Sequence, residues 1–214
     1  MTLQELIASY RAQSLDNFEP YLADDKLLGH FASEAQVEAC RRGQLLVSTV
    51  TIPVAVGAQE IELPATAIRV IRSSIGGSPL QEITADGMDE YFPGWQDDAH
   101  QGKPRYLVSG VNTGRLCIWP VPAEAFTIRL TLQNLPSKRL VNCNDAPEIR
   151  PETHPALVDW MLHRVYSRTD GDLIDPAKAA ASLARFEAEF GRKASGRNEQ
   201  WVRQGDGLMP GPIA

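Results

Sequence analysis

The end of the chain holds the clearest structural pattern. Residues 154–190 read HPALVDWMLHRVYSRTDGDLIDPAKAAASLARFEAEF. Apolar residues recur at helical spacing over 154–168 and again over 175–190. Pro176 follows an aspartate, which is typical of a helix start, and Gly191 is typical of a stop in the left-handed conformation. The stretch therefore predicts two consecutive helices.

Two more helices are predicted near the amino terminus. Thr2 and Glu5 fit a capping box, in which the threonine hydroxyl and the glutamate carboxylate each accept from a free amide of the first turn. A stronger apolar stripe predicts a second helix from Asp24 to about Leu46. Glu38 and Arg42 fall mainly on its polar face, one turn apart, where they can form an ion pair.

Between these helical ends, the hydrophobic period changes to two. Short β-branched or alternating runs, separated by glycine and proline turns, predict six or seven strands over 48–132. The strictest alternation is at 126–132, which predicts a half-buried antiparallel strand. Residues 105–109 and 115–119 predict a β-hairpin.

Strands in one block with helices on both sides of it are typical of an α+β fold rather than a parallel α/β fold. We expect an antiparallel helix bundle formed by 1–47 plus 147–191. A small antiparallel β-sandwich or barrel is inserted at 48–146, and an extended C-terminal arm follows at 192–214.

The composition excludes several classes of protein. With 214 residues, 43% of them apolar, the chain can bury a sizeable core. The formal net charge of −6 disfavours a protein that reads DNA, because such proteins need a basic surface. The three cysteines are far apart and lack metal-ligand spacing, which favours free thiols in a reducing compartment. We see no signal peptide and no apolar run long enough to span a membrane.

Candidate chemical sites are weak. Asp159 and His163 lie one helical turn apart and could pair as in a hydrolase, but no recognisable nucleophile accompanies them. His100 follows two aspartates in a polar loop, and a solvated loop is the simpler interpretation. We expect no enzyme activity, catalytic residue, metal site or cofactor.

A second interpretation is a β-sheet module that binds a ligand or carbohydrate, in a phage tail or another assembly. It would use aromatic residues of the strand region and their neighbours as a stacking face, and it requires those rings to be exposed. The candidate residues are Trp95, Tyr106, Trp119 and Phe126.

The arm at 192–214 combines glycines, prolines and charges, a composition typical of disorder. It also contains large apolar residues, which favours docking on a partner or a neighbouring subunit over a fraying tail. We expect the apolar anchors to be Trp201, Val202, Leu208 and Met209, and the charged contacts to be made by Arg197 and Arg203.

Most of residues 20–191 resembles the head-to-tail adaptor (connector) proteins of tailed bacteriophages, and is similar to the tail tubular protein A type of short-tailed phages. The residues that carry the likeness are Ser33–Arg42, Gly57–Pro64, Gly102–Tyr106 with Leu116–Pro122, and Pro147–Ile149 leading to Ala156–Trp160. These motifs are structural rather than catalytic.

The resemblance implies a homo-oligomeric ring, commonly of twelve copies, that docks under the portal protein and carries the tail tube or nozzle protein. DNA would pass through the lumen without sequence-specific binding, and the arm would insert into the portal. The protein would be a virion component without a membrane, assembled in the host cytoplasm. A neighbouring connector layer would look similar from one chain. Small residues on the last helix would pack closely against the next subunit; these are Ala177, Ala180, Ala181 and Ala184.

Overall fold

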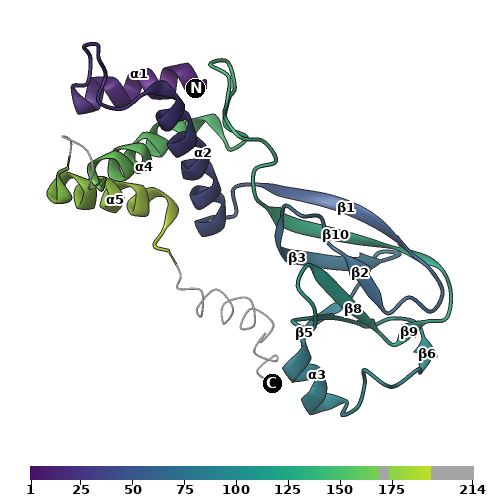
Figure 1. Cartoon of the computed structure of the whole chain (residues 1–214). Helices are drawn as coiled ribbons and strands as arrows, with labels where there is room; N and C mark the ends of the chain where they lie inside the picture. The colour runs from purple at the N-terminus through teal and green to yellow at the C-terminus, as the bar shows by residue number, and fades with distance from the viewer. Residues whose placement is uncertain (169–173, 194–214) are drawn as a thin grey trace, which may run out of the picture. The chain divides into compact units, whose positions relative to one another are not determined.

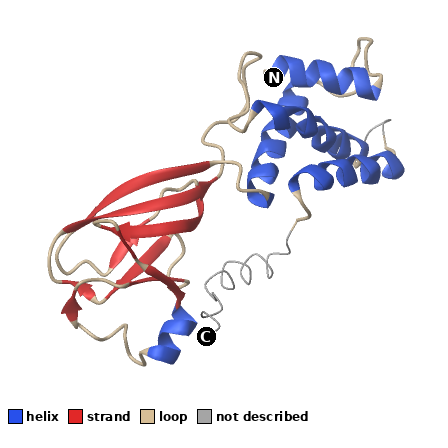
Figure 2. Cartoon of the chain, turned by 180° about the vertical axis from the view of Figure 1, so that it is seen from behind, coloured by secondary structure: helices blue, strands red, loops and turns tan. Residues whose placement is uncertain are grey.

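A computed structural model describes residues 1–168 and 174–193. The chain forms two compact units (Figure 1). One unit contains Met1–Leu46 and Leu135–Lys193, and the other contains Val47–Asn134. Except for one short helix, helices and strands fall into different units (Figure 2). The fold is therefore mixed α+β, with helices at both ends of the chain and mainly antiparallel sheets, as predicted.

The first unit is helical. Its elements are α1 (Leu3–Ser14), α2 (Asp25–Arg42), the 3-10 helix η1 (Pro151–Thr153), α4 (His154–Tyr166) and α5 (Pro176–Phe190). The predicted capping box is confirmed, because the Thr2 side chain accepts from the Glu5 amide and the Glu5 carboxylate accepts from the Thr2 amide. The helices share one core, to which α1 contributes Leu6 and Tyr10 and α5 contributes Phe186.

Two helix ends differ from the prediction. Helix α2 ends at Arg42 rather than near Leu46, because Gly43 adopts an extended conformation with φ −118° and ψ 157°. Gly191 ends α5 with φ 87° and ψ 165°, so it is not in the predicted left-handed helical conformation. Its positive φ still favours glycine at this position.

The segment 135–146 belongs with the helices, although we expected it in the inserted β domain. Ser33 on α2 accepts a hydrogen bond at Oγ from the Leu140 amide at 2.9 Å. Gln36 donates from Nε2 to the Lys138 carbonyl at 2.9 Å. These polar side chains lie on the buried side of α2. There they form hydrogen bonds with the backbone of a chain segment that has no regular structure of its own.

The second unit contains the strands. They are β1 (Val47–Val54), β2 (Glu60–Glu62), β3 (Ala67–Ile75), β4 (Ser78–Pro79), β5 (Gln81–Thr84), β6 (Gln101–Gly102), β7 (Tyr106–Ser109), β8 (Arg115–Trp119), β9 (Val121–Pro122) and β10 (Phe126–Asn134), with helix α3 (Ala85–Tyr91) after β5. One sheet has the order β1-β10-β3-β4 and another the order β2-β8-β7-β5, while β6 pairs with β9. Among the described residues, these sheets do not close into a barrel.

Two strand pairs are parallel, which corrects the expectation of a purely antiparallel β domain. Strand β5 runs parallel to β7, and β6 runs parallel to β9. A parallel pair needs a long crossover connection rather than a tight turn. Helix α3 and the loop that follows it provide this connection between β5 and β7.

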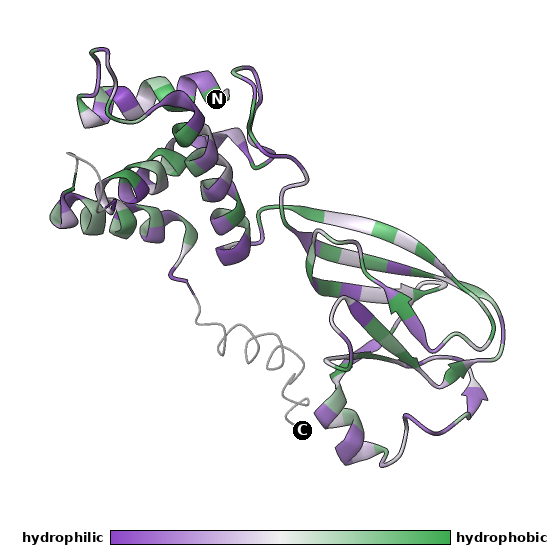
Figure 3. Cartoon of the chain, in the orientation of Figure 1, coloured by the Kyte–Doolittle hydropathy of each residue, from purple (hydrophilic) through white to green (hydrophobic). Residues whose placement is uncertain are grey.

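The core of the second unit follows the predicted alternation. Ile128, Leu130 and Leu132 on β10 are fully buried, while Thr127 and Arg129 are exposed. Hydropathy alternates along the long strands (Figure 3). Buried residues of both four-stranded sheets join one cluster. The predicted hairpin is also confirmed, because β7 and β8 pair in antiparallel register.

Candidate interaction surfaces

Helix α5 buries one face in the helical unit. The Asp175 side chain accepts a hydrogen bond from the Lys178 amide and caps the helix, as the sequence predicts. That cap holds the pKa of the Asp175 carboxyl below its usual value. Phe186 is fully buried and packs against Trp160 of α4 in a tilted arrangement, with 5.0 Å between ring centroids. Aromatic packing of this kind fixes the rotation of α5 on α4.

The four alanines predicted for subunit packing lie on the outside of α5. They are Ala177, Ala180, Ala181 and Ala184, and all four are exposed. The buried positions on this helix are instead Ala179, Ser182, Phe186 and Phe190. The solvent side of a globular protein's helix normally carries long polar side chains. This face is therefore smooth, and another helix or loop could approach it closely.

The predicted carboxylate–imidazole pair finds other partners. Asp159 accepts a hydrogen bond from Arg185 Nε at 2.6 Å. His163 Nδ1 lies 3.0 Å from the Ala179 carbonyl oxygen, which can only accept, so this nitrogen carries the proton. Both side chains thus join α4 to α5. The geometry favours a structural role over a hydrolase.

A buried arginine joins three helices. The Arg42 side chain is only 4% exposed, and its guanidinium pairs with Glu38 at 3.6 Å and with Glu187 at 3.5 Å. Its Cζ lies 5.3 Å from the centroid of the Trp160 ring and 5.0 Å from that of Phe186. We call this set the Arg42 cluster. The sequence indicates the Glu38–Arg42 pair, but it does not reveal that α5 covers it.

The Arg42 cluster also fixes the last described residues. Arg42 Nη1 donates to the Gly191 carbonyl at 3.2 Å, and Lys193 Nζ lies 3.9 Å from Glu38 Oε1. The predicted arm residues Arg197, Trp201, Val202, Arg203, Leu208 and Met209 lie outside the described residues. The cluster therefore contacts Gly191 and Lys193, at the end of the described part of the chain.

In the β unit, the aromatic residues pack on one another. Phe92 lies 4.6 Å from Trp119 and 5.5 Å from Tyr106, measured between ring centroids. Trp95 is buried and donates from Nε1 to Asp89 Oδ1 at 2.8 Å. Phe126 is partly buried against the other core cluster. These rings do not present the open stacking face that the ligand-binding interpretation requires.

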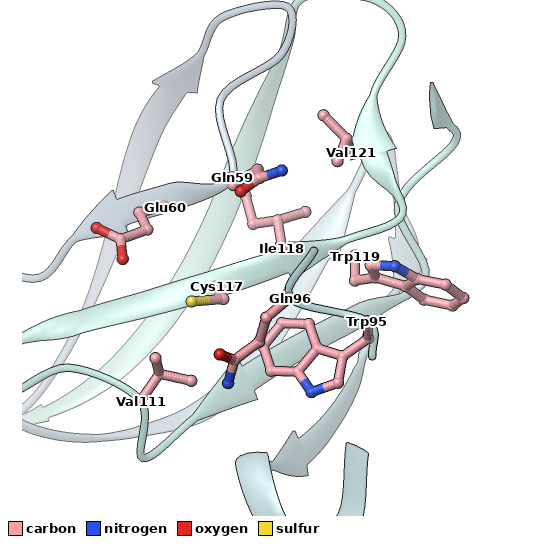
Figure 4. A pocket seen from close by; sticks show the side chains of 9 residues that line it. All are labelled: Gln59, Glu60, Trp95, Gln96, Val111, Cys117, Ile118, Trp119 and Val121. Carbon is pink, nitrogen blue, oxygen red and sulfur yellow. The ribbon is translucent and has the colours of Figure 1, made fainter. Parts of the chain in front are cut away.

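A small cavity of about 190 Å³ lies beside these rings (Figure 4). Trp95, Cys117 and Trp119 line it together with polar residues of β2 and the loop after α3. Burial raises the pKa of the Cys117 thiol, so this sulfur stays protonated and is a poor nucleophile. Glu60 at the rim is already paired with Arg115 at 3.0 Å. The cavity therefore has no evident catalytic arrangement.

The structure adds two observations on metals and membranes. Within residues 1–168 and 174–193, no three His, Cys, Asp or Glu side chains are grouped so that they could hold a metal ion. His100 lies with its ring 6.5 Å from that of Trp119, between centroids. No described helix combines the length and the apolar composition needed to cross a bilayer.

The chain also matches a known protein family. The SU10 adaptor protein family matches residues 1–207 of the chain. The chain belongs to the SU10 adaptor protein family. No protein in a curated set matches it. Because the family match covers both units, the helical ends and the strand block belong to one adaptor architecture.

Membership in the SU10 adaptor family confirms the coarser part of the sequence-based interpretation. The protein is a bacteriophage adaptor with a structural role, a component of the virion that interacts with other head and tail proteins. The narrower likeness to the tail tubular protein A type stays a prediction.

Proposed function

We propose that this SU10-family adaptor forms a homo-oligomeric ring that joins the portal protein to the tail tube or nozzle protein and continues the DNA channel. The family match over residues 1–207 is the observation that carries this proposal. The ring has twelve copies and follows the plan of the tail tubular protein A type. Subunits assemble in the host cytoplasm onto the portal.

The described surfaces support a role in assembly rather than catalysis. The candidate acid–base residues Asp159 and His163 serve as helix contacts, and the Cys117 thiol is held protonated. Helix α5 offers a smooth alanine face to its surroundings. These contacts support the proposal of a structural rather than an enzymatic role for this chain.

The C-terminal arm is the part that engages the portal. Residues 192–214 start beside the Arg42 cluster, where Arg42 bonds to the Gly191 carbonyl. The sequence beyond Lys193 combines apolar anchors with arginines, a pattern that suits docking in a groove with charged edges. Anchoring its start at a fixed place reduces the entropy that the arm loses on docking.

Passage of DNA fits the overall charge. The chain carries 21 Lys and Arg against 27 Asp and Glu. A lumen lined by subunits of net negative charge makes few attractive contacts with phosphates, so DNA can slide through without sequence-specific binding.

Electron microscopy of the purified chain mixed with rings of the cognate portal protein tests the proposal. We expect an added ring stacked on one end of the portal, with a continuous central channel. A variant truncated after Lys193 should form helices and strands as before but bind the portal far more weakly. If the truncated chain binds the portal as well as the full chain, the arm has no role in portal binding. If the full chain adds no ring to the portal, the proposal itself is overturned.

A further inference from the structure

The loop between α1 and α2 exposes an unusual amount of apolar surface. Leu15 is 78% exposed, Phe18 85%, Leu22 52% and Tyr21 38%. These side chains come from eight consecutive residues, 15–22, which we call the apolar loop. Single exposed apolar residues are ordinary, but a contiguous group on a soluble protein marks an interaction surface.

The apolar loop is held in a defined conformation. Asp16 is only 5% exposed, and its carboxylate accepts from the Leu22 amide at 3.0 Å and the Ala23 amide at 3.2 Å. Arg11 donates to the same carboxylate at 3.3 Å, and its Cζ lies 3.4 Å above the centroid of the Tyr21 ring. A loop built around a buried ion pair presents Phe18 without a large ordering cost on binding.

The outer face of α5 has the matching shape and charge. Its surface consists of alanines, so a bulky apolar side chain can lie flat against it. Lys178 and Arg185 border this face; they are 65% and 54% exposed and pair within the unit with Asp175 and Asp159. The apolar loop contains the exposed carboxylate of Glu19, and it is followed by Asp24, which caps α2, and Asp25, which pairs with Arg11. The two surfaces therefore match in apolar character, with acidic residues near one and basic residues at the edge of the other.

The positions of the two surfaces favour contact between different copies. Helix α4 packs against both α1 and α5, and it lies between them in Figures 1 and 2. The apolar loop lies on the side of α1 away from α5. A contact between unlike surfaces on different sides of one unit is heterologous, and such contacts generate closed rings when the rotation between subunits closes.

We propose that the apolar loop of one copy packs against the outer face of α5 in the next copy. This inference rests on the proposed ring and names the contact between its subunits. Phe18 is the central anchor, and the alanines at 177, 181 and 184 form the surface it covers.

Two substitutions test the contact without disturbing the core, because both positions are exposed. Phe18→Ser removes the anchor, and Ala181→Arg places a long charged side chain on the smooth face. We expect each variant to abolish the multi-copy species that the wild type forms, alone or on the portal, when mass is measured by light scattering. Tyr91→Ser removes another exposed aromatic residue, 69% exposed in the β unit, and should leave assembly unchanged.

A cross-linking experiment tests which surfaces meet. Cys40 and Cys117 are buried, so Cys143→Ser removes the exposed thiol. In this background, Phe18→Cys and Ala181→Cys chains should form disulfide-linked dimers when mixed, and few when oxidised separately. Loop-to-loop dimers of the Phe18→Cys chain would contradict the heterologous contact.

The outcomes separate this inference from the proposed function. If the wild type assembles and both Phe18→Ser and Ala181→Arg assemble equally well, the contact is overturned and the ring stands. If the wild type stays a monomer both alone and with the portal, the proposed function fails and the contact fails with it.

Discussion

Arg42 is a charged residue that contacts three helices of the helical unit. Its guanidinium lies against Trp160 and Phe186 while it pairs with Glu38 and Glu187. Burying a charge is costly unless good partners surround it, and removal of one partner leaves the others unpaired. This one side chain therefore connects the end of α2 to both α4 and α5.

Arg42→Met should destabilise the helical unit by about 3 kcal/mol, because it removes a buried guanidinium that pairs with both Glu38 and Glu187 and packs on two aromatic rings. Arg41→Met is the matched control, since the Arg41 side chain is 37% exposed and pairs with the same Glu38. We expect the control to cost under about 1 kcal/mol. Urea unfolding followed by circular dichroism measures both values. If both variants lose the same free energy of unfolding, the burial of Arg42 does not account for its contribution to stability.

Glu82 should make the stability of the β unit depend on pH. Burial raises the pKa of Glu82, and the Ser73 hydroxyl and the Arg69 guanidinium offset this only in part. A carboxyl with a raised folded-state pKa favours the folded state while protonated, and this contribution is lost as pH rises through the folded pKa. Glu82→Gln should therefore be more stable than the wild type at pH 7, with the difference vanishing at and below about pH 4. Thermal unfolding measures this difference across the pH range. If the stability difference between Glu82→Gln and the wild type stays constant with pH, the raised pKa of Glu82 is contradicted.

Single residues also show where sequence-based prediction stops. The Glu38–Arg42 pair is local, so its spacing predicts it. Its burial depends on α5, which lies far along the chain, so no local pattern indicates it. In the sequence, the apolar loop is indicated by Phe18 and Tyr21, two aromatic residues that lie between the predicted helices. Their exposure follows from the Arg11–Asp16 pair that holds the loop outward.

Among the elements, the connecting segment at 135–150 depends on α2. The Ser33 hydroxyl accepts from the Leu140 amide at 2.9 Å and lies 3.0 Å from the Gly29 carbonyl oxygen, to which it can donate. Gln36 accepts at Oε1 from the Glu148 amide at 3.3 Å. Because this segment lacks regular structure, side chains of a neighbouring helix replace its missing backbone partners.

Ser33→Ala should cost about 1–3 kcal/mol, because it leaves the buried Leu140 amide without an acceptor. Hydrogen exchange of the Leu140 amide should accelerate more than that of amides in α4. Ser9→Ala on α1 is the control, because Ser9 is only partly buried and accepts a hydrogen bond from the exposed Gln13 side chain, so the expected change is within about 0.5 kcal/mol. Unchanged exchange at Leu140 would mean that other contacts hold this segment.

The elements that sequence predicted well are those with local causes. The alternation at 126–132 predicts β10, and the apolar stripe predicts α4. The parallel pairing of β5 with β7 was not predicted, because partner choice depends on the crossover through α3 rather than on either strand's own pattern. For α5, composition indicated close packing, but only the structure shows that its alanines face outward.

At the scale of the whole molecule, each unit has its own core. Phe186 belongs to the core of the helical unit, and Leu130 belongs to that of the β unit. Phe186→Ala should cost the helical unit about 3–5 kcal/mol, and Leu130→Ala should cost the β unit about 2–5 kcal/mol. Hydrogen exchange followed by mass spectrometry should show faster exchange mainly in the unit that carries the substitution. Equal acceleration in both units would indicate one cooperative structure.

The central claim is that this SU10-family chain is a ring-forming adaptor between portal and tail. The most direct test is the mass of the purified 23.5 kDa chain, measured by mass photometry alone and after mixing with portal rings. The account predicts that the portal species gains the mass of many copies, about twelve on the proposed stoichiometry. A portal species of unchanged mass beside a free 23.5 kDa monomer would contradict it.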